Sequence, residues 1–145
     1  MINKNYKTFL SESAAYGVFG ASLKGQNMGN LILDNLRKSG FTAFGINPKA
    51  KDDNNIYKDI ESLPETTQKA VIAVSGKYVQ DVLRECIERK ISDIWIQPGA
   101  VDEKELSGFP DEVNVYPGRC LLAHLQSAGF PHNLHRGLLK LFGKY

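Results

Sequence analysis

The chain has 145 residues, of which 42% are hydrophobic and 23% charged, a composition typical of a globular protein with a substantial hydrophobic core. Its net charge of +2 at pH 7 is too small to indicate nucleic acid as a partner, and no apolar run approaches the ~20 residues that would cross a membrane. Residues 1–6 lack the charged-then-apolar order of a signal peptide, and Cys86 and Cys120 form no CxxC pair, so we expect a protein of the reducing cytoplasm.

Strand-like and helix-like patterns alternate along the chain. Apolar runs predict five strands, over residues 15–20, 42–46, 69–74, 93–96 and 114–116. Apolar residues at helical spacing predict a helix from Met28 that Gly40 closes, a short helical turn near Ile60, and a helix over 78–90. This alternation predicts an α/β fold, a doubly wound, five-stranded parallel Rossmann-like sheet with helices on both faces and residues 15–19 at its centre.

In such a sheet, ligands bind at the carboxyl ends of the strands. The predicted strand ends carry small or turn-forming residues, which permit a ligand to approach the backbone closely. The four strand ends that contain them are Gly20, Ala21 and Ser22; Asn47, Pro48 and Lys49; Ser75 and Gly76; and Gln97, Pro98 and Gly99.

The loop after the first strand has the features of a phosphate site. Gly20 allows a sharp turn, Ala21 is small, and Ser22 offers a hydroxyl group. The start of the following helix, around Gly29, favours an anion. We expect the side chain of Ala21 to face an open cleft, so that a pyrophosphate could reach the backbone. The alternative is a plain strand-to-helix turn that needs glycine for its geometry alone.

The loop after the second strand indicates which nucleotide binds. An NAD-binding domain usually has an acid here to hold the free ribose hydroxyl, whereas this chain has Asn47 and Lys49. The Lys49 ammonium favours a phosphate on the ribose, as in coenzyme A or NADP. The alternative is that Lys49 is a solvated loop charge.

Several of these motifs together resemble a known family. They are Val18–Ser22, Gly40-Phe41, Ile46–Lys49, Tyr57, Leu63-Pro64, Trp95–Ala100 and Arg119-Cys120. At this spacing the chain is similar to the stand-alone CoA-binding-domain proteins and, more distantly, to the CoA-binding Rossmann domain of the succinate–CoA ligase α subunit. The resemblance covers Lys7 to Leu125.

The resemblance implies a role for each matching position. Gly20, Ala21 and Ser22 would hold the pyrophosphate of CoA. Lys49 would meet the phosphorylated ribose, with Asn47 and Pro48 shaping the wall of the site. Val74, Ser75 and Gly76 would line the adenine or pantetheine side. The chain departs from its relatives at 75–78 and at 121–124, which leaves the pantetheine end open.

The sequence contains no recognisable catalytic set. His132 and His135 have the spacing of a helical zinc pair, but no cysteine or carboxylate nearby completes the ligands, so we expect no metal. Cys120 follows the last strand and would lie at the pocket mouth or serve as a buried thiol. Trp95 is expected in the core. No Ser-His-Asp or paired-carboxylate arrangement stands out, which favours a protein without a reaction of its own.

We expect residues 1–145 to form a single CoA-binding domain in which 126–145 is a helical extension. Asn133 to Tyr145 has the pattern of a basic amphipathic helix. We expect it to dock on its own sheet or on a second subunit, giving a homodimer, rather than on a membrane.

Two functions remain. The first is a non-catalytic CoA or acyl-CoA binding protein, a sensor or carrier, with this small nucleotide as its partner. The alternative is a small NADP-dependent oxidoreductase or redox-sensing nucleotide-binding domain. The chain has no Tyr-x-x-x-Lys pair, which counts against an oxidoreductase.

Overall fold

The structure, a computed structural model, describes residues 1–11, 13–25, 27–51 and 56–127. The strands within these ranges are β1 (Ala15–Phe19), β2 (Thr42–Ile46), β3 (Ile56–Tyr57), β4 (Thr67–Ile72), β5 (Asp93–Ile96) and β6 (Asn114–Tyr116). The α-helices are α1 (Met28–Lys38), α2 (Gly76–Glu88) and α3 (Leu121–Ser127), and short 3₁₀ helices span Tyr6–Thr8 and Glu103–Glu105.

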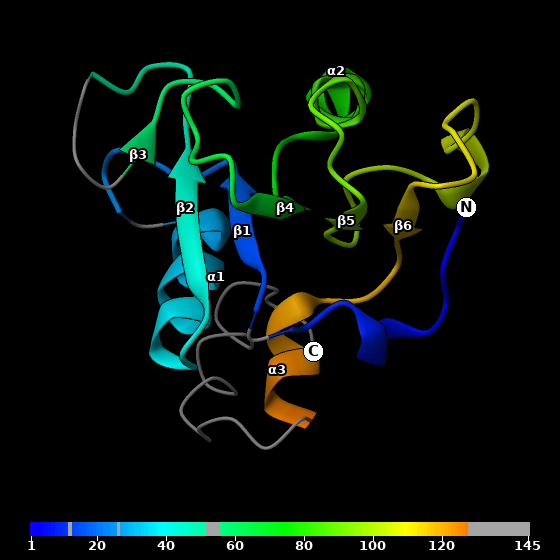
Figure 1. The fold of residues 1–145 in the computed structure, drawn as a ribbon, viewed down its shortest axis with the longest axis horizontal. Helices are drawn as coiled ribbons and strands as arrows, with labels where there is room; N and C mark the ends of the chain where they lie inside the picture. Colours follow the sequence, from blue (N-terminus) through cyan, green and yellow to red (C-terminus); the bar gives the residue numbers. More distant parts are fainter. Residues whose placement is uncertain (12, 26, 52–55, 128–145) are drawn as a thin grey trace.

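The strands form one parallel sheet in the order β3-β2-β1-β4-β5-β6, with β1 in its interior (Figure 1). Val18 of β1 pairs with Gly45 of β2 on one side and with Val71 of β4 on the other. The predicted fold class and the central position of β1 are therefore confirmed. The additional strand is β3, a two-residue strand beside β2.

Most element boundaries agree with the prediction. The bounds of β2, β5 and β6 and the start of α1 are as expected, whereas β4 and α2 each begin and end two residues earlier. The short helical turn predicted near Ile60 is a single turn in the structure and is not followed by a helix. The chain makes a tight turn there, in which the Leu63 N–H donates to the Ile60 carbonyl at 3.2 Å.

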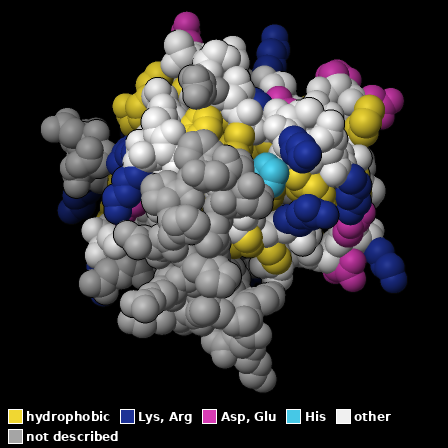
Figure 2. All heavy atoms as spheres, turned by 90° about the horizontal axis from the view of Figure 1, so that it is seen from below, with side chains coloured by type: hydrophobic (Ala, Val, Ile, Leu, Met, Phe, Trp, Pro, Cys, Tyr) yellow, Lys and Arg dark blue, Asp and Glu magenta, His cyan; other side chains and the backbone are white. Residues whose placement is uncertain are grey.

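Helices cover both faces of the sheet. Tyr16 and Val18 of β1 are buried on the face that α1 and α3 cover, and Phe19 is buried on the face that α2 covers. Figure 1 shows α2 above the sheet and the other two helices below it. The lower face is drawn in Figure 2, where hydrophobic side chains are visible between basic ones. A parallel sheet packed on both faces explains why its strands have continuous apolar runs.

Trp95 is fully buried, as predicted for a core residue. Its ring stacks on that of Tyr116 with 6.0 Å between centroids, and its Nε1 donates to the Arg119 carbonyl at 2.8 Å. This bond joins β5 to the segment that leads into α3. Among the described helices, none has the length and apolar character that a membrane crossing requires.

Candidate functional site

A cavity of about 280 Å³ lies at the carboxyl ends of β4 and β5, beside the start of α1. Its lining residues come from three places in the chain: Met28; Ala73, Val74, Ser75 and Gly76; and Gln97, Pro98, Gly99 and Ala100. The strand order reverses between β1 and β4, and such a switch point is where open α/β sheets bind their ligands. The cavity is therefore the candidate site.

The cavity contains one part of the predicted site. Val74, Ser75, Gly76, Pro98 and Gly99 all line it. A Cβ atom at Gly76 would lie 2.2 Å from the carbonyl oxygen of Ala100, so only glycine permits this close approach. The start of α2 thus packs directly on the loop after β5.

The loop after β1 lies next to the cavity. Gly20 has a φ of 98°, in the left-handed region, and a Cβ atom there would lie 2.3 Å from the Ala73 carbonyl oxygen. A side chain is therefore excluded on two grounds, conformation and space. Gly20 brings the loop against the end of β4, where Ala73 lines the cavity.

The first turn of α1 packs on this same loop. A Cβ atom at Gly29 would lie 2.5 Å from the Gly20 carbonyl oxygen. Asn27 caps the helix, because its side chain accepts from the Asn30 N–H at 3.0 Å. The N–H groups of Met28 and Gly29 have no acceptor among the described residues. The positive end of the helix dipole therefore borders the cavity, a favourable position for an anion.

Two backbone donors of the loop are already engaged. The Gly20 N–H donates to the Ile46 carbonyl at 3.3 Å, and the Ser22 N–H donates to Asn30 Oδ1 at 2.7 Å. A phosphate beside this loop would depend on other donors, of which Met28 and Gly29 offer two. The pyrophosphate role of 20–22 stays a prediction.

The expected orientation of Ala21 is wrong. Its side chain is fully buried in the core between α1 and the sheet, with Val18 and Leu33, instead of facing an open cleft. Strand alternation would place Ala21 on the face of Phe19, but Gly20 follows the end of β1 with a φ of 98°, and Ala21 lies instead in the same buried cluster as Val18. Small size at Ala21 thus serves packing against α1.

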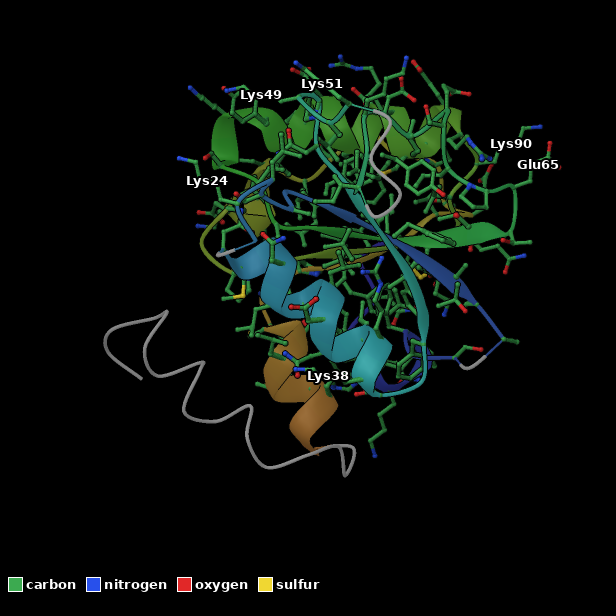
Figure 3. All side chains as sticks on the ribbon, turned by 90° about the vertical axis from the view of Figure 1, so that its left-hand side faces the viewer. Lys24, Lys38, Lys49, Lys51, Glu65 and Lys90 are labelled. Atoms are coloured by element: carbon green, nitrogen blue, oxygen red, sulfur yellow. The ribbon has the colours of Figure 1, made fainter. Side chains whose placement is uncertain are left out.

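Asn47, Pro48 and Lys49 lie outside the cavity lining. Asn47 is anchored, since its Nδ2 donates to the Ala21 carbonyl at 2.8 Å, whereas Pro48 and Lys49 are exposed. Lys49 forms no ion pair with a described residue. Figure 3 shows Lys24, Lys49 and Lys51 at one end of the molecule, away from Glu65 and Lys90. Lys24 and Lys49 lie in the loops that follow β1 and β2, so their positive charges are near the carboxyl ends of these strands.

Gln97, one of the predicted strand-end residues, is a buried residue of the cavity wall, and its contacts with α3 were not predicted. Its Oε1 accepts from the Leu121 N–H at 2.9 Å, and its Nε2 lies 3.5 Å from Cys120 Sγ. Gln97 thereby fixes the start of α3 to the end of β5. The feature of the sequence that could have indicated this role is a polar residue directly after an apolar strand.

Both cysteines are free thiols. Burial raises the pKa of the Cys86 thiol, which makes it an inert core residue. Cys120 is half-buried beside the cavity wall residue Gln97. Within the described residues no cluster of His, Cys, Asp and Glu could hold a metal ion. His132 and His135, and the predicted helix over 133–145, lie outside the described residues.

Comparison with known proteins gives a family and several relatives. The family model described as "CoA binding domain" matches residues 14–126. The ADP-forming acetate–CoA ligase I of Archaeoglobus fulgidus is 28% identical over 93 residues, which make up 63% of this chain but 14% of that protein. This chain is thus similar to a small part of the ligase.

Solved structures agree with this match. A conserved hypothetical protein from Pyrococcus furiosus is 27% identical, with a TM-score of 0.64 over 77% of this chain and 98% of that one. A Thermus thermophilus protein that is 19% identical has the same fold, with a TM-score of 0.72 over 88% of this chain and 98% of that one.

Proposed function

The chain belongs to the CoA binding domain family, and from this premise we propose that it binds coenzyme A or an acyl-CoA without a reaction of its own, as a sensor or carrier. The observation that carries the proposal is the cavity at the ends of β4 and β5, at the switch point of a sheet of this family. The activity of the ligase relative is not proposed, because the similarity covers only 14% of that protein.

Each part of CoA has a proposed place. The diphosphate would lie at the start of α1, beside Gly20, Ala21 and Ser22, where the helix dipole favours negative charge. The phosphorylated ribose would lie near Lys49, with Asn47 and Pro48 at its side. The lysines at this edge of the sheet support the placement, because CoA is a polyanion.

The cavity would hold one arm of the ligand. Its volume of about 280 Å³ is at the lower end of the ~300–1,000 Å³ typical of small-molecule pockets. Val74, Ser75 and Gly76, with Pro98 and Gly99, would therefore enclose the pantetheine or the adenine rather than the whole molecule. Lys49 would suit the ribose phosphate of NADP equally well, so NADPH is the competing ligand.

The test compares ligands by thermal unfolding. CoA, acetyl-CoA, NADPH and NADH are each added to the purified protein at increasing concentration. We expect CoA to stabilise the fold, by about 2.7 kcal/mol at a concentration a hundred times its Kd, and NADH to have no effect. Stabilisation by NADPH but not by CoA would favour the redox alternative. Mass spectrometry of ligand retained through purification identifies the acyl group.

A further inference from the structure

Three asparagine side chains each donate to one of three successive carbonyl groups in the loop after β1. Asn27 Nδ2 donates to the Gly20 carbonyl at 2.7 Å. Asn47 Nδ2 donates to the Ala21 carbonyl at 2.8 Å, and Asn30 Nδ2 donates to the Ser22 carbonyl at 3.0 Å. No carbonyl of this three-residue segment is left without a donor.

The amides are held in place from their other side as well. Asn30 Oδ1 accepts from the Ser22 N–H at 2.7 Å, and Asn30 itself is 8% exposed. Asn27 Oδ1 accepts from the Asn30 N–H at 3.0 Å. Asn47 Oδ1 accepts from the Lys49 N–H at 2.9 Å. Each amide therefore has one donor and one acceptor engaged, which fixes its orientation.

This arrangement has an electrostatic consequence. A carbonyl oxygen carries partial negative charge, and bare carbonyls beside a phosphate would repel it. A neutral amide can donate to a carbonyl and accept from an N–H at once, without adding charge. A carboxylate cannot donate, and it would add a negative charge where the ligand is negative.

We propose that Asn27, Asn30 and Asn47 are positioning residues that make the loop at 20–22 accept the diphosphate of a nucleotide ligand. Their amide groups donate to the loop carbonyls, and the N–H groups at the start of α1 are left to face the anion. This inference rests on the proposed function, and it names the part of the ligand that the loop selects.

Asn27 offers the sharpest test because it is exposed and caps α1. In Asn27→Asp the new side chain caps as well as asparagine does, but it cannot donate to the Gly20 carbonyl. Asn27→Ser also keeps a cap and is too short to reach that carbonyl, and it adds no charge. Asn30→Asp is the second site, since it keeps the acceptor for the Ser22 N–H and loses the donor.

Asn35→Asp is the matched control. Asn35 lies on the same helix, and its Nδ2 also donates to a carbonyl, that of Leu31, at 2.8 Å. It lies eight residues beyond Asn27, about 12 Å along the helix axis. The same chemical change is thus made on α1 outside the loop.

Dissociation constants for CoA and for ADP are measured by calorimetry, with thermal midpoints recorded for every variant. We expect Asn27→Asp and Asn30→Asp to raise the dissociation constants of both ligands by about tenfold or more. Asn27→Ser should raise them by about threefold, and Asn35→Asp by less than about twofold. In Asn27→Asp the thermal midpoint should stay at the value of the control.

Wild-type affinity in Asn27→Asp, or a loss that only follows a falling thermal midpoint, would overturn the inference. If the wild-type protein binds ADP but not CoA, the proposed function fails while the ADP series still decides the role of the asparagines. If it binds neither, the loop accepts no diphosphate and both proposals fall.

Discussion

The packing around Ala21 leaves no room for a side chain larger than a methyl group. Its side chain is fully buried, and a Cβ atom built at Gly45 would lie 3.1 Å from the Ala21 Cβ. We expect Ala21→Leu to lower the free energy of unfolding by about 1–3 kcal/mol, because the larger side chain overpacks the contact with α1. Urea denaturation measures the change. Leu23→Ala, in the same loop at a 50% exposed position, should change it by less than about 0.5 kcal/mol. A stable Ala21→Leu protein would contradict the buried position.

In the proposed complex, Lys49 would determine the preference for a phosphorylated ribose. We expect Lys49→Ala to weaken CoA binding by about 1.5–3 kcal/mol, the range for a hydrogen bond to a charged group. The binding of dephospho-CoA, which lacks that phosphate, should be weakened much less. Calorimetry with both ligands measures the difference. Lys38→Ala is the control, because Lys38 is the last residue of α1 and lies far from the start of this helix, where the candidate site is (Figure 3). Equal losses for the two ligands would show that Lys49 does not contact the phosphate.

At the residue scale, the sequence was informative where residue type alone restricts the backbone or the charge. Gly20 and Gly76 were recognised as positions of close approach, and both lie against a carbonyl oxygen. Asn27, Asn30 and Gln97 received no specific role. Their amides act on carbonyl and N–H groups of other segments, and only the folded chain shows which groups those are.

The start of α2 packs closely on the loop after β5. A Cβ atom at Gly76 would lie 2.2 Å from the Ala100 carbonyl oxygen, so Gly76→Ala must push α2 away from the loop after β5. We expect a loss of about 1–3 kcal/mol in unfolding free energy together with weaker CoA binding, because both segments line the cavity. Lys77→Ala, at the next and exposed position, is the control for denaturation and binding. An unchanged Gly76→Ala protein would contradict the packing.

The helix α3 carries a pH-dependent group, His124. Burial and, to a lesser degree, the nearby Arg119 charge lower the pKa of His124 from its usual 6.5. The unfolded chain therefore binds this proton more readily than the folded one, and stability is lost as pH falls below 6.5. We expect His124→Gln to reduce this part of the pH dependence, measured as unfolding free energy against pH. An identical profile for both proteins would contradict the assignment.

Buried strands were predictable from their apolar residues even where they are short, whereas elements that depend on contacts with other segments were not. The strands β2, β5 and β6 were predicted within their observed bounds because both of their faces are buried. The strand β3 has only two residues and depends on pairing with β2. The helix α3 has seven residues, and its stability comes from packing of Leu121, Leu122 and Leu125 in the core, not from its own propensity.

For the whole molecule, parallel topology places the carboxyl ends of all the strands on the same side of the sheet. The loops after β1, β2, β4 and β5 meet there, together with the first turns of α1 and α2. Lys24, Lys49 and Lys51 lie at this end, as Figure 3 shows. The location of the candidate site thus follows from the fold class, which the sequence predicted. The details inside the site follow from contacts between distant segments.

Backbone amide NMR with stepwise addition of CoA shows whether CoA binds at the carboxyl ends of the strands. We expect the shifted amides to gather around 20–29, Lys49, 74–76 and 97–100, where the loop, the first turn of α1 and the cavity wall lie. The amide signals of Lys69 and Asp93, which lie at the amino ends of β4 and β5, should not shift. Shifts confined to the amino ends of the strands, or no shifts at saturating CoA, would mean that CoA does not bind at the carboxyl ends.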